Sequence, residues 1–236
     1  MKGLSTNMFF FIGLDDTDTL ESRGTGHLAR QVAAALSADH NVLGVTRHQL
    51  LLDPRVPYTA KNSSAAVVLE LNGCFEPNGL MERVRAVMLE NYQPGSDPGL
   101  CVAWSVPKSI AEFGRRAQQE LVTQDEARSL ALAHDIPLIG LGGDENGVIG
   151  ALAAVGLAVS GEDGRYVLVG RSRELSGLQP VSAVLAAGIA AVRTLDDQPV
   201  TDGLVQSDKL RPARRGGEPV LVVEWAGEYW QPLKLD

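Results

Sequence analysis

Short apolar runs and stretches with helical spacing alternate along the first half of the chain. Met8–Leu14 is an apolar run that ends at two aspartates, whereas Leu28, Val32 and Leu36 recur at helical intervals. The pattern predicts a strand, a helix, two strands, a helix and a strand, at Met8–Leu14, His27–Ala38, Asn41–Leu52, Ala65–Leu71, a helix around Val84, and Leu100–Val106. This β-α-β-β-α-β order is typical of the split βαβ, or ferredoxin-like, arrangement, for which we expect helices on one face of the sheet.

After Pro107 the pattern changes to two consecutive helices, each opened by a capping box. In both, a hydroxyl and a carboxylate three residues later can satisfy the first N–H groups of the helix: Ser109 with Glu112, and Thr123 with Glu126. A strand at 136–141, a glycine-rich turn and a helix at 148–159 are predicted to follow.

The last part of the chain carries weaker signals. Strands are expected at 166–169, 189–193, 220–225 and 229–233. Arg211, Arg214 and Arg215, followed by two glycines, are typical of a basic, solvated connector. The expected fold class is α/β (α+β): a ferredoxin-like half over 1–106 with an aspartate motif, and a helical and α/β half over 107–236 with a glycine-rich loop, forming one compact unit with a shared cleft.

Composition removes several classes of protein. The 236 residues are 44% hydrophobic, which is enough for a core without disulfides or a structural metal. With 29 acidic and 21 basic residues the net charge is −8, so a long-range field that attracts nucleic acid unaided is not expected. We read Cys74 and Cys101 as core residues. No apolar stretch reaches the ~20 residues of a membrane span, and no secretion signal is apparent, so we expect a cytoplasmic protein without a membrane partner.

Candidate chemistry begins where the first strand ends. Asp15, Asp16 and Asp18 follow an apolar strand directly and precede a helix. Unpaired carboxylates are costly to bury, and Mg²⁺ binds one or two of them together with phosphate oxygens, so the motif predicts a magnesium site. A polar turn with an aspartate cap is the alternative. The frame is one residue short of a haloacid-dehalogenase motif, and the glycine and final glutamate of a calcium-binding EF-hand loop are missing.

The next motif is Gly24-Thr25-Gly26. The two glycines allow a ligand to approach the backbone, and Thr25 lies at the expected helix N-terminus, where N–H groups favour phosphate. Thr25 can equally be a plain helix cap.

Two further turns are candidate phosphate sites. Gly142, Gly143, Asn146 and Gly147 connect a strand to a helix, an arrangement that can cradle phosphate, although it is not a Walker A loop. A tight turn capped by Asp144 or Asn146 is the alternative. The turn with Lys61 and Asn62 offers one ammonium and several donors, or is simply a solvent-facing loop. His48 is expected to be a packing residue.

Together these segments resemble a known family. Ile12-Gly-Leu-Asp-Asp-Thr-Asp-Thr, the Thr25 that follows in register, Leu52-Asp-Pro-Arg-Val-Pro-Tyr58 and Gly147-Val-Ile-Gly-Ala-Leu-Ala-Ala-Val-Gly156 are similar to segments of the kinase-like N-terminal domain of archaeal tRNA(Ile) 2-agmatinylcytidine synthetases. The resemblance covers about residues 8–160.

The resemblance implies an ATP- and Mg²⁺-dependent phosphoryl-transfer site, which in that family activates a tRNA cytidine for agmatine. It implies catalytic roles for Asp15, Asp16, Asp18 and Thr25, with the three aspartates as metal ligands and Thr25 as the residue that receives or contacts the γ-phosphate. Nucleotide contacts are expected from Thr17, Gly24, Gly26, Lys61, Asn62, Gly142, Gly143, Asn146 and Gly147.

The chain also departs from the family pattern. Gly26 and His27 replace a threonine and a tyrosine, and Gly143-Asp144-Glu145-Asn146 replaces basic residues. We expect no room for the family's OB-fold and zinc-ribbon modules. The prediction is therefore a phosphotransferase-like protein that does not use intact tRNA as its acceptor without the help of another component. Its partners would be a nucleotide and either a small-molecule acceptor or a chain that supplies RNA binding, with a homodimer left open. The alternatives are a non-catalytic nucleotide- or metabolite-binding regulatory module, or one subunit of a split tRNA-modifying enzyme.

Overall fold

The computed structural model describes residues 8–56, 61–71 and 77–235, so the expectations for Tyr58 and Cys74 lie outside the described residues. The helices of this part of the chain are α1 (Thr25–Leu36), α2 (Pro77–Asn91), α3 (Lys108–Gln119), α4 (Gln124–Ala133), α5 (Gly147–Ser160) and α6 (Val181–Ala186). The strands are β1 (Met8–Asp15), β2 (Asn41–Gln49), β3 (Ser63–Leu71), β4 (Gly99–Ala103), β5 (Leu138–Gly140), β6 (Arg165–Leu168), β7 (Leu178–Pro180), β8 (Ala191–Thr194), β9 (Leu204–Gln206), β10 (Ala213–Arg215), β11 (Glu218–Trp225) and β12 (Trp230–Pro232).

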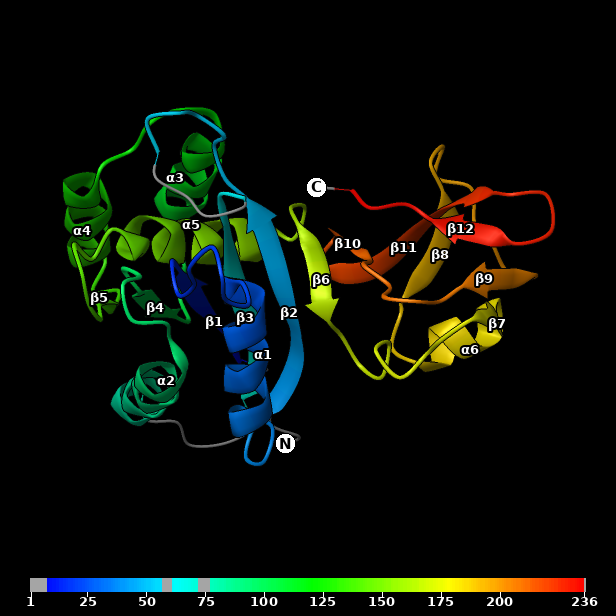
Figure 1. Cartoon of the computed structure of the whole chain (residues 1–236), viewed down its shortest axis with the longest axis horizontal. Helices are drawn as coiled ribbons and strands as arrows, with labels where there is room; N and C mark the ends of the chain where they lie inside the picture. The colour runs from blue at the N-terminus through cyan, green and yellow to red at the C-terminus, as the bar shows by residue number, and fades with distance from the viewer. Residues whose placement is uncertain (1–7, 57–60, 72–76, 236) are drawn as a thin grey trace, which may run out of the picture.

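One mixed sheet runs through the whole molecule, which confirms the mixed α/β class (Figure 1). Its strand order is β5-β4-β1-β3-β2-β6-β10-β11-β12-β9-β7, with β8 paired to β11. The first six predicted elements are present in the predicted order, and β1 pairs antiparallel with both β3 and β4. The sheet extends beyond these strands at both edges, because β5 joins β4 and β6 joins β2.

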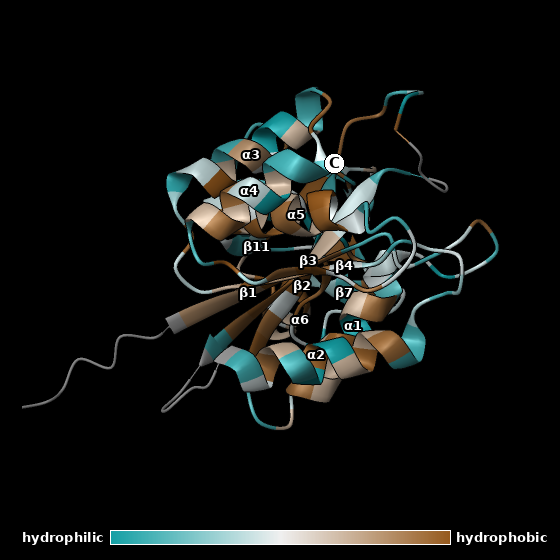
Figure 2. Ribbon diagram, turned by 90° about the vertical axis from the view of Figure 1, so that its left-hand side faces the viewer, coloured by the Kyte–Doolittle hydropathy of each residue, from teal (hydrophilic) through white to brown (hydrophobic). Residues whose placement is uncertain are grey.

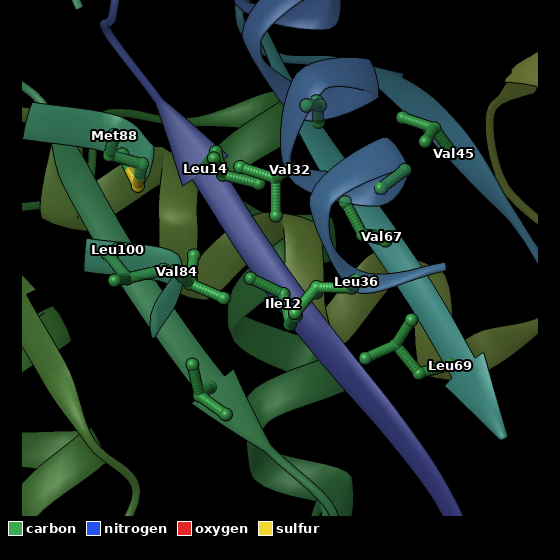
Figure 3. Close-up of a cluster of buried hydrophobic side chains, with 14 of the residues drawn as sticks. Ile12, Leu14, Val32, Leu36, Val45, Val67, Leu69, Val84, Met88 and Leu100 are labelled. Atoms are coloured by element: carbon green, nitrogen blue, oxygen red, sulfur yellow. The ribbon is translucent and has the colours of Figure 1, made fainter. Parts of the chain in front are cut away.

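The two helices of the predicted β-α-β-β-α-β unit, α1 and α2, pack on one face of the β1–β4 region as expected, and α5 from the later part of the chain covers the other face (Figure 2). Alternate side chains of a strand point to opposite faces. Ile12 and Leu14 therefore pack with Val32 of α1 and Met88 of α2, in the core of Figure 3. Phe11 instead belongs to the second core, which is built around α5.

The α5 helix can lie on the second face because it is apolar all round and rich in small residues. Its side chains from Val148 to Ala158 are buried apart from Ile149, which is partly buried. A Cβ at Gly13 of β1 would come within 1.9 Å of the Ala151 carbonyl oxygen, so the absence of a side chain there lets the helix touch the strand. The predicted halves 1–106 and 107–236 thus share a sheet and a core, and their boundary as domains stays a prediction.

Of the two predicted capping boxes, one is present. Thr123 accepts a hydrogen bond from the Glu126 N–H at 3.2 Å, and the Glu126 carboxylate accepts one from the Thr123 N–H at 3.0 Å. The box at Ser109 was wrong, because the N-cap of α3 is Pro107, two residues before Ser109, and the Ser109 hydroxyl lies 2.9 Å from Nε2 of His134.

A third core, around Tyr166, Val192 and Leu221, holds the C-terminal strands together. The expected connector at 211–217 contains β10, and Arg214 is only 6% exposed, so a solvated loop was wrong for that residue. Its guanidinium donates to the carbonyls of Ala158 at 3.1 Å and Gly217 at 2.8 Å and contacts the Tyr166 hydroxyl. Among the described helices, none is long and apolar enough to cross a bilayer.

Candidate functional site

The first turn of α5 brings the aspartate motif and the glycine-rich turn together. Asp15 is the last residue of β1, and a Cβ at Gly150 would come within 1.7 Å of its Oδ2. A Cβ at Gly147 would lie 2.4 Å from the Asp97 carbonyl oxygen and 2.9 Å from that of Asp15. Only glycine at these two helix positions allows this approach, so the small residues serve the site as well as the packing.

A cleft opens beside this contact. Five of the predicted site residues line it: Asp15, Asp16, Asn62, Asn146 and Gly147. The rest of its wall comes from the segment after β2, the end of α3 and the start of α5, and it is mostly apolar. Besides the charged Arg55 and Glu120, it consists of Leu50, Leu51, Val56, Ala117, Leu121, Val122, Ile149 and Gly150. A few polar groups converging in a mainly apolar hollow are typical of a small-molecule site.

The carboxylates at the cleft repel one another. Desolvation, followed by the charge of Asp16, raises the pKa of Asp15 from 3.8 to about 8. Desolvation and the charges of Asp97 and Asp18 raise the pKa of Asp16 to about 6. Asp16 also has a left-handed backbone, with a φ of 50°. These surroundings disfavour the ionised form of both carboxyl groups, and a bound cation would favour it.

Asp97 was missed by the sequence interpretation. It lies just before β4, accepts a hydrogen bond from the Asp144 N–H at 2.9 Å through Oδ1, and receives the Gly147 N–H on its carbonyl at 2.9 Å. The signal that could have found it is topological. Because β4 runs antiparallel to β1, the start of β4 lies beside the end of β1.

No three His, Cys, Asp or Glu side chains of the described residues are arranged to hold a metal ion by themselves. Mg²⁺ commonly takes one or two carboxylates and completes its octahedron with water and substrate phosphates. Asp15 and Asp16, two adjacent carboxylates that face the cleft, fit that requirement.

Asp18 and Thr25 form a second arrangement at the start of α1. Asp18 Oδ1 accepts hydrogen bonds from the Thr25 N–H at 3.1 Å and from its hydroxyl at 2.9 Å. Thr17 donates to the Thr25 hydroxyl at 3.3 Å, and both threonines are buried. Asp18 thereby caps α1, as the alternative interpretation of the motif expected. Neither Asp18 nor Thr25 is among the described residues that line the Asp15–Asp16 cleft.

The other predicted nucleotide contacts lie apart from the cleft walls. Gly142 and Gly143 come before the cleft residues Asn146 and Gly147 in the same turn, and Gly143 has a φ of 60°. Lys61 is exposed, and Gly24 and Gly26 flank Thr25. The first N–H groups of α5 already have partners, because Val148 donates to Glu145 at 3.2 Å and Ile149 to Asn146 at 3.1 Å. Free N–H groups for phosphate, as the sequence suggested, are therefore not found at these two positions.

Comparison with known proteins relates this chain to a class of tRNA-modifying enzymes. No family model matches the chain. It is homologous over about 63% of its length to the tRNA 2-agmatinylcytidine synthetases called TiaS; the match to the TiaS protein of Pyrococcus horikoshii is 28% identical over 155 residues, 63% of this chain and 36% of that protein. An uncharacterised protein of Methanocaldococcus jannaschii is 29% identical over 149 residues, 62% of this chain. The match spans 49% of that relative, so the chain corresponds to half or less of these proteins.

Solved structures give the same relationship. A complex of TiaS with its tRNA and ATP matches with a TM-score of 0.55 at 25% identity, over 63% of this chain and 36% of that chain. A tRNA fluorescent labelling enzyme matches with a TM-score of 0.55 at 26% identity, with the same coverage. The resemblance seen in the sequence is thus confirmed, and the fold is TiaS-like.

Proposed function

We propose that this chain binds ATP with Mg²⁺ in the Asp15–Asp16 cleft and transfers the γ-phosphoryl group, as a unit related to tRNA modification. The observation that carries the proposal is the position of Asp15 and Asp16. Two carboxylates with raised pKa values lie beside the first turn of α5 in a mainly apolar cleft. Homology to a synthetase solved with ATP supports the choice of nucleotide.

In this proposal the residues divide the work by position. Asp15 and Asp16 hold the metal ion, which when bound neutralises phosphate charge. The N-terminal end of α5 adds its positive dipole beside them. The apolar residues of the wall, such as Leu50, Val122 and Ile149, exclude water from the adenosine portion. Asn62 is held in place because its amide donates to the Leu51 carbonyl at 2.7 Å.

Thr25 is proposed as the residue that receives the transferred γ-phosphoryl group. Its hydroxyl donates to Asp18, so that carboxylate is positioned to take the proton as the Thr25 oxygen attacks the γ-phosphorus. The bond from the γ-phosphorus to the bridging oxygen would break in the same step, and ADP would leave. Thr25 is only 6% exposed, so this role requires the segment between β1 and α1 to open toward the nucleotide. A mass increase of one phosphate on Thr25 after incubation with ATP and Mg²⁺ would support the role, and unmodified Thr25 with ongoing ATP consumption would exclude it.

Calorimetry and ATP consumption test the proposal as a whole. Wild type should bind ATP in a Mg²⁺-dependent manner, whereas Asp16→Asn should not. Asp135→Asn is a matched control, because Asp135 also has a left-handed backbone, with a φ of 53°, but is exposed at the end of α4. Absence of binding heat for wild type with ATP and Mg²⁺ at millimolar concentration would overturn the proposal.

A second candidate function is a nucleotide- or metabolite-binding module without turnover. The observation in its favour is that the N–H groups of Val148 and Ile149 are already used within the turn, so fewer donors remain for a transferring phosphoryl group. The same assays separate the two. ATP bound by wild type but consumed only at the rate of Asp16→Asn favours the module. A split tRNA-modifying enzyme would instead show turnover only when tRNA and a second chain are added.

A further inference from the structure

Arginines gather where α1 meets β6, although the chain as a whole carries a net charge of −8. We call Arg23, Arg30, Arg173 and Arg211 the arginine cluster. They come from three separate segments: α1 with the residues just before it, the link after β6, and the residues before β10. Arg23 and Arg173 are exposed, and Arg30 and Arg211 are partly buried.

Backbone contacts explain how the cluster is assembled. A Cβ at Gly26 of α1 would lie 3.9 Å from a methyl group of Val167 in β6, so the two elements touch there. Arg30 donates to the Gly26 carbonyl at 2.7 Å, and Arg173 donates to the Val167 carbonyl at 3.2 Å. Both guanidinium groups are therefore anchored at the same α1–β6 contact. Figure 1 shows β6 next to β2.

Arg211 approaches the cluster from the other edge of β6. The Tyr166 N–H donates to the carbonyl of Pro212 at 2.7 Å, which fixes the residues before β10 against β6. The Arg211 guanidinium donates to the Leu210 carbonyl at 2.9 Å. Like Arg30 and Arg173, it is held by a carbonyl and retains further N–H groups.

The cluster is electrostatically uncompensated. Desolvation and the charges of Arg173 and Arg23 lower the pKa of Arg30. Desolvation and the charges of Arg173, Arg30 and Arg165 lower the pKa of Arg211. Elsewhere arginines pair with carboxylates, as Arg83 does with Asp39 and Arg128 with Glu145, but among the described residues no such ion pair is found for the four members. Like charges held together without counterions destabilise the fold, so the arrangement calls for an anion.

We propose that the arginine cluster is a binding site for a ligand that carries several phosphate groups in a row. Guanidinium groups bind phosphate oxygens in pairs, and four of them on three chain segments span more than a single phosphate. The backbone of a nucleic-acid strand and the triphosphate of a nucleotide share this chemistry. The members of the cluster do not line the Asp15–Asp16 cleft, so the site goes beyond the proposed function and does not depend on ATP turnover.

Binding to a short fluorescein-labelled single-stranded RNA, measured by anisotropy, tests the proposal. The cluster variant is Arg30→Gln/Arg173→Gln/Arg211→Gln. The control Arg85→Gln/Arg115→Gln/Arg193→Gln removes the same charge from arginines outside the cluster. Each phosphate contact on a single strand contributes about 0.7 to the salt slope, so the cluster variant should lose about 2 in slope and on the order of 100-fold in affinity near 0.1 M salt. The control should stay close to wild type.

Competition identifies the source of the phosphates. If tripolyphosphate or ATP displaces the RNA from the cluster at comparable concentrations, the ligand is the triphosphate of a nucleotide. If both compete only weakly, the ligand is the backbone of a nucleic-acid strand. Either outcome supports the site. Equal losses in the cluster and control variants, or wild type that binds none of the three probes, would overturn it.

Folding is read out independently. At low salt the melting temperature of the cluster variant should exceed that of the control, because like-charge repulsion is relieved. Replacing the three cluster residues by lysine should retain part of the affinity, which a merely structural role would not predict.

Discussion

Replacing Asp16 by Asn should stabilise the protein while it removes function. The folded-state pKa of Asp16 is raised from 3.8 to about 6. The stability that its protonated form contributes is therefore complete below about pH 4 and lost as the pH rises through about 6. A change of this size corresponds to about 3 kcal/mol, and solvent screening of a partly exposed group reduces it to about 1–2 kcal/mol.

Urea unfolding at several pH values measures this effect. The difference in free energy of unfolding between Asp16→Asn and wild type should grow by about 1–2 kcal/mol from pH 4 to pH 8. Asn also tolerates the left-handed backbone at this position, a pH-independent gain that Asp135→Asn reports separately. Added Mg²⁺ should stabilise wild type, by about 2.7 kcal/mol at one hundred times its Kd, and leave Asp16→Asn unchanged. Parallel pH profiles for wild type and Asp16→Asn would show that the pKa of Asp16 is not raised in the folded protein.

Three further predictions concern the surrounding structure. Gly150→Ala should abolish Mg²⁺-dependent ATP binding, because the new Cβ would lie 1.7 Å from Asp15 Oδ2, whereas Gly142→Ala, with its nearest neighbour at 3.8 Å, should bind as wild type does in calorimetry. Burial lowers the pKa of His48, so wild type should lose stability relative to His48→Gln below about pH 6.5 in urea unfolding, and a constant difference would contradict this. Arg214→Leu should lower the free energy of unfolding by about 2–4 kcal/mol in chemical denaturation, against less than about 0.5 kcal/mol for the exposed Arg215→Leu. Similar losses for both variants would contradict a stabilising role for the buried Arg214 contacts.

Long apolar segments of the sequence were the most reliable guide to the fold. The apolar strand β1 and the helix α5 were predicted close to their observed bounds, because each carries many consecutive apolar positions. The short strands β7, β9 and β10 were not predicted, since they do not lie in an apolar run or an alternating segment long enough to indicate a strand.

The limits of the site prediction are tertiary. Asp15, Asp16 and Gly147 were predicted from the sequence, and the structure brings them to one cleft. Asp97 has no motif of its own and becomes visible only once β4 lies beside β1. Arg214 carries a charge that favours solvent, but carbonyl groups from α5 and the turn after β10 meet it inside the protein. Neither environment is encoded in local spacing.

Calorimetric titration of wild type with ATP, with and without Mg²⁺, measures directly whether the Asp15–Asp16 cleft binds a metal–nucleotide complex. We expect binding that requires Mg²⁺, is lost in Asp16→Asn and is retained in Asp135→Asn. Binding that is the same in all three proteins, or no binding by wild type at millimolar ATP, would contradict it.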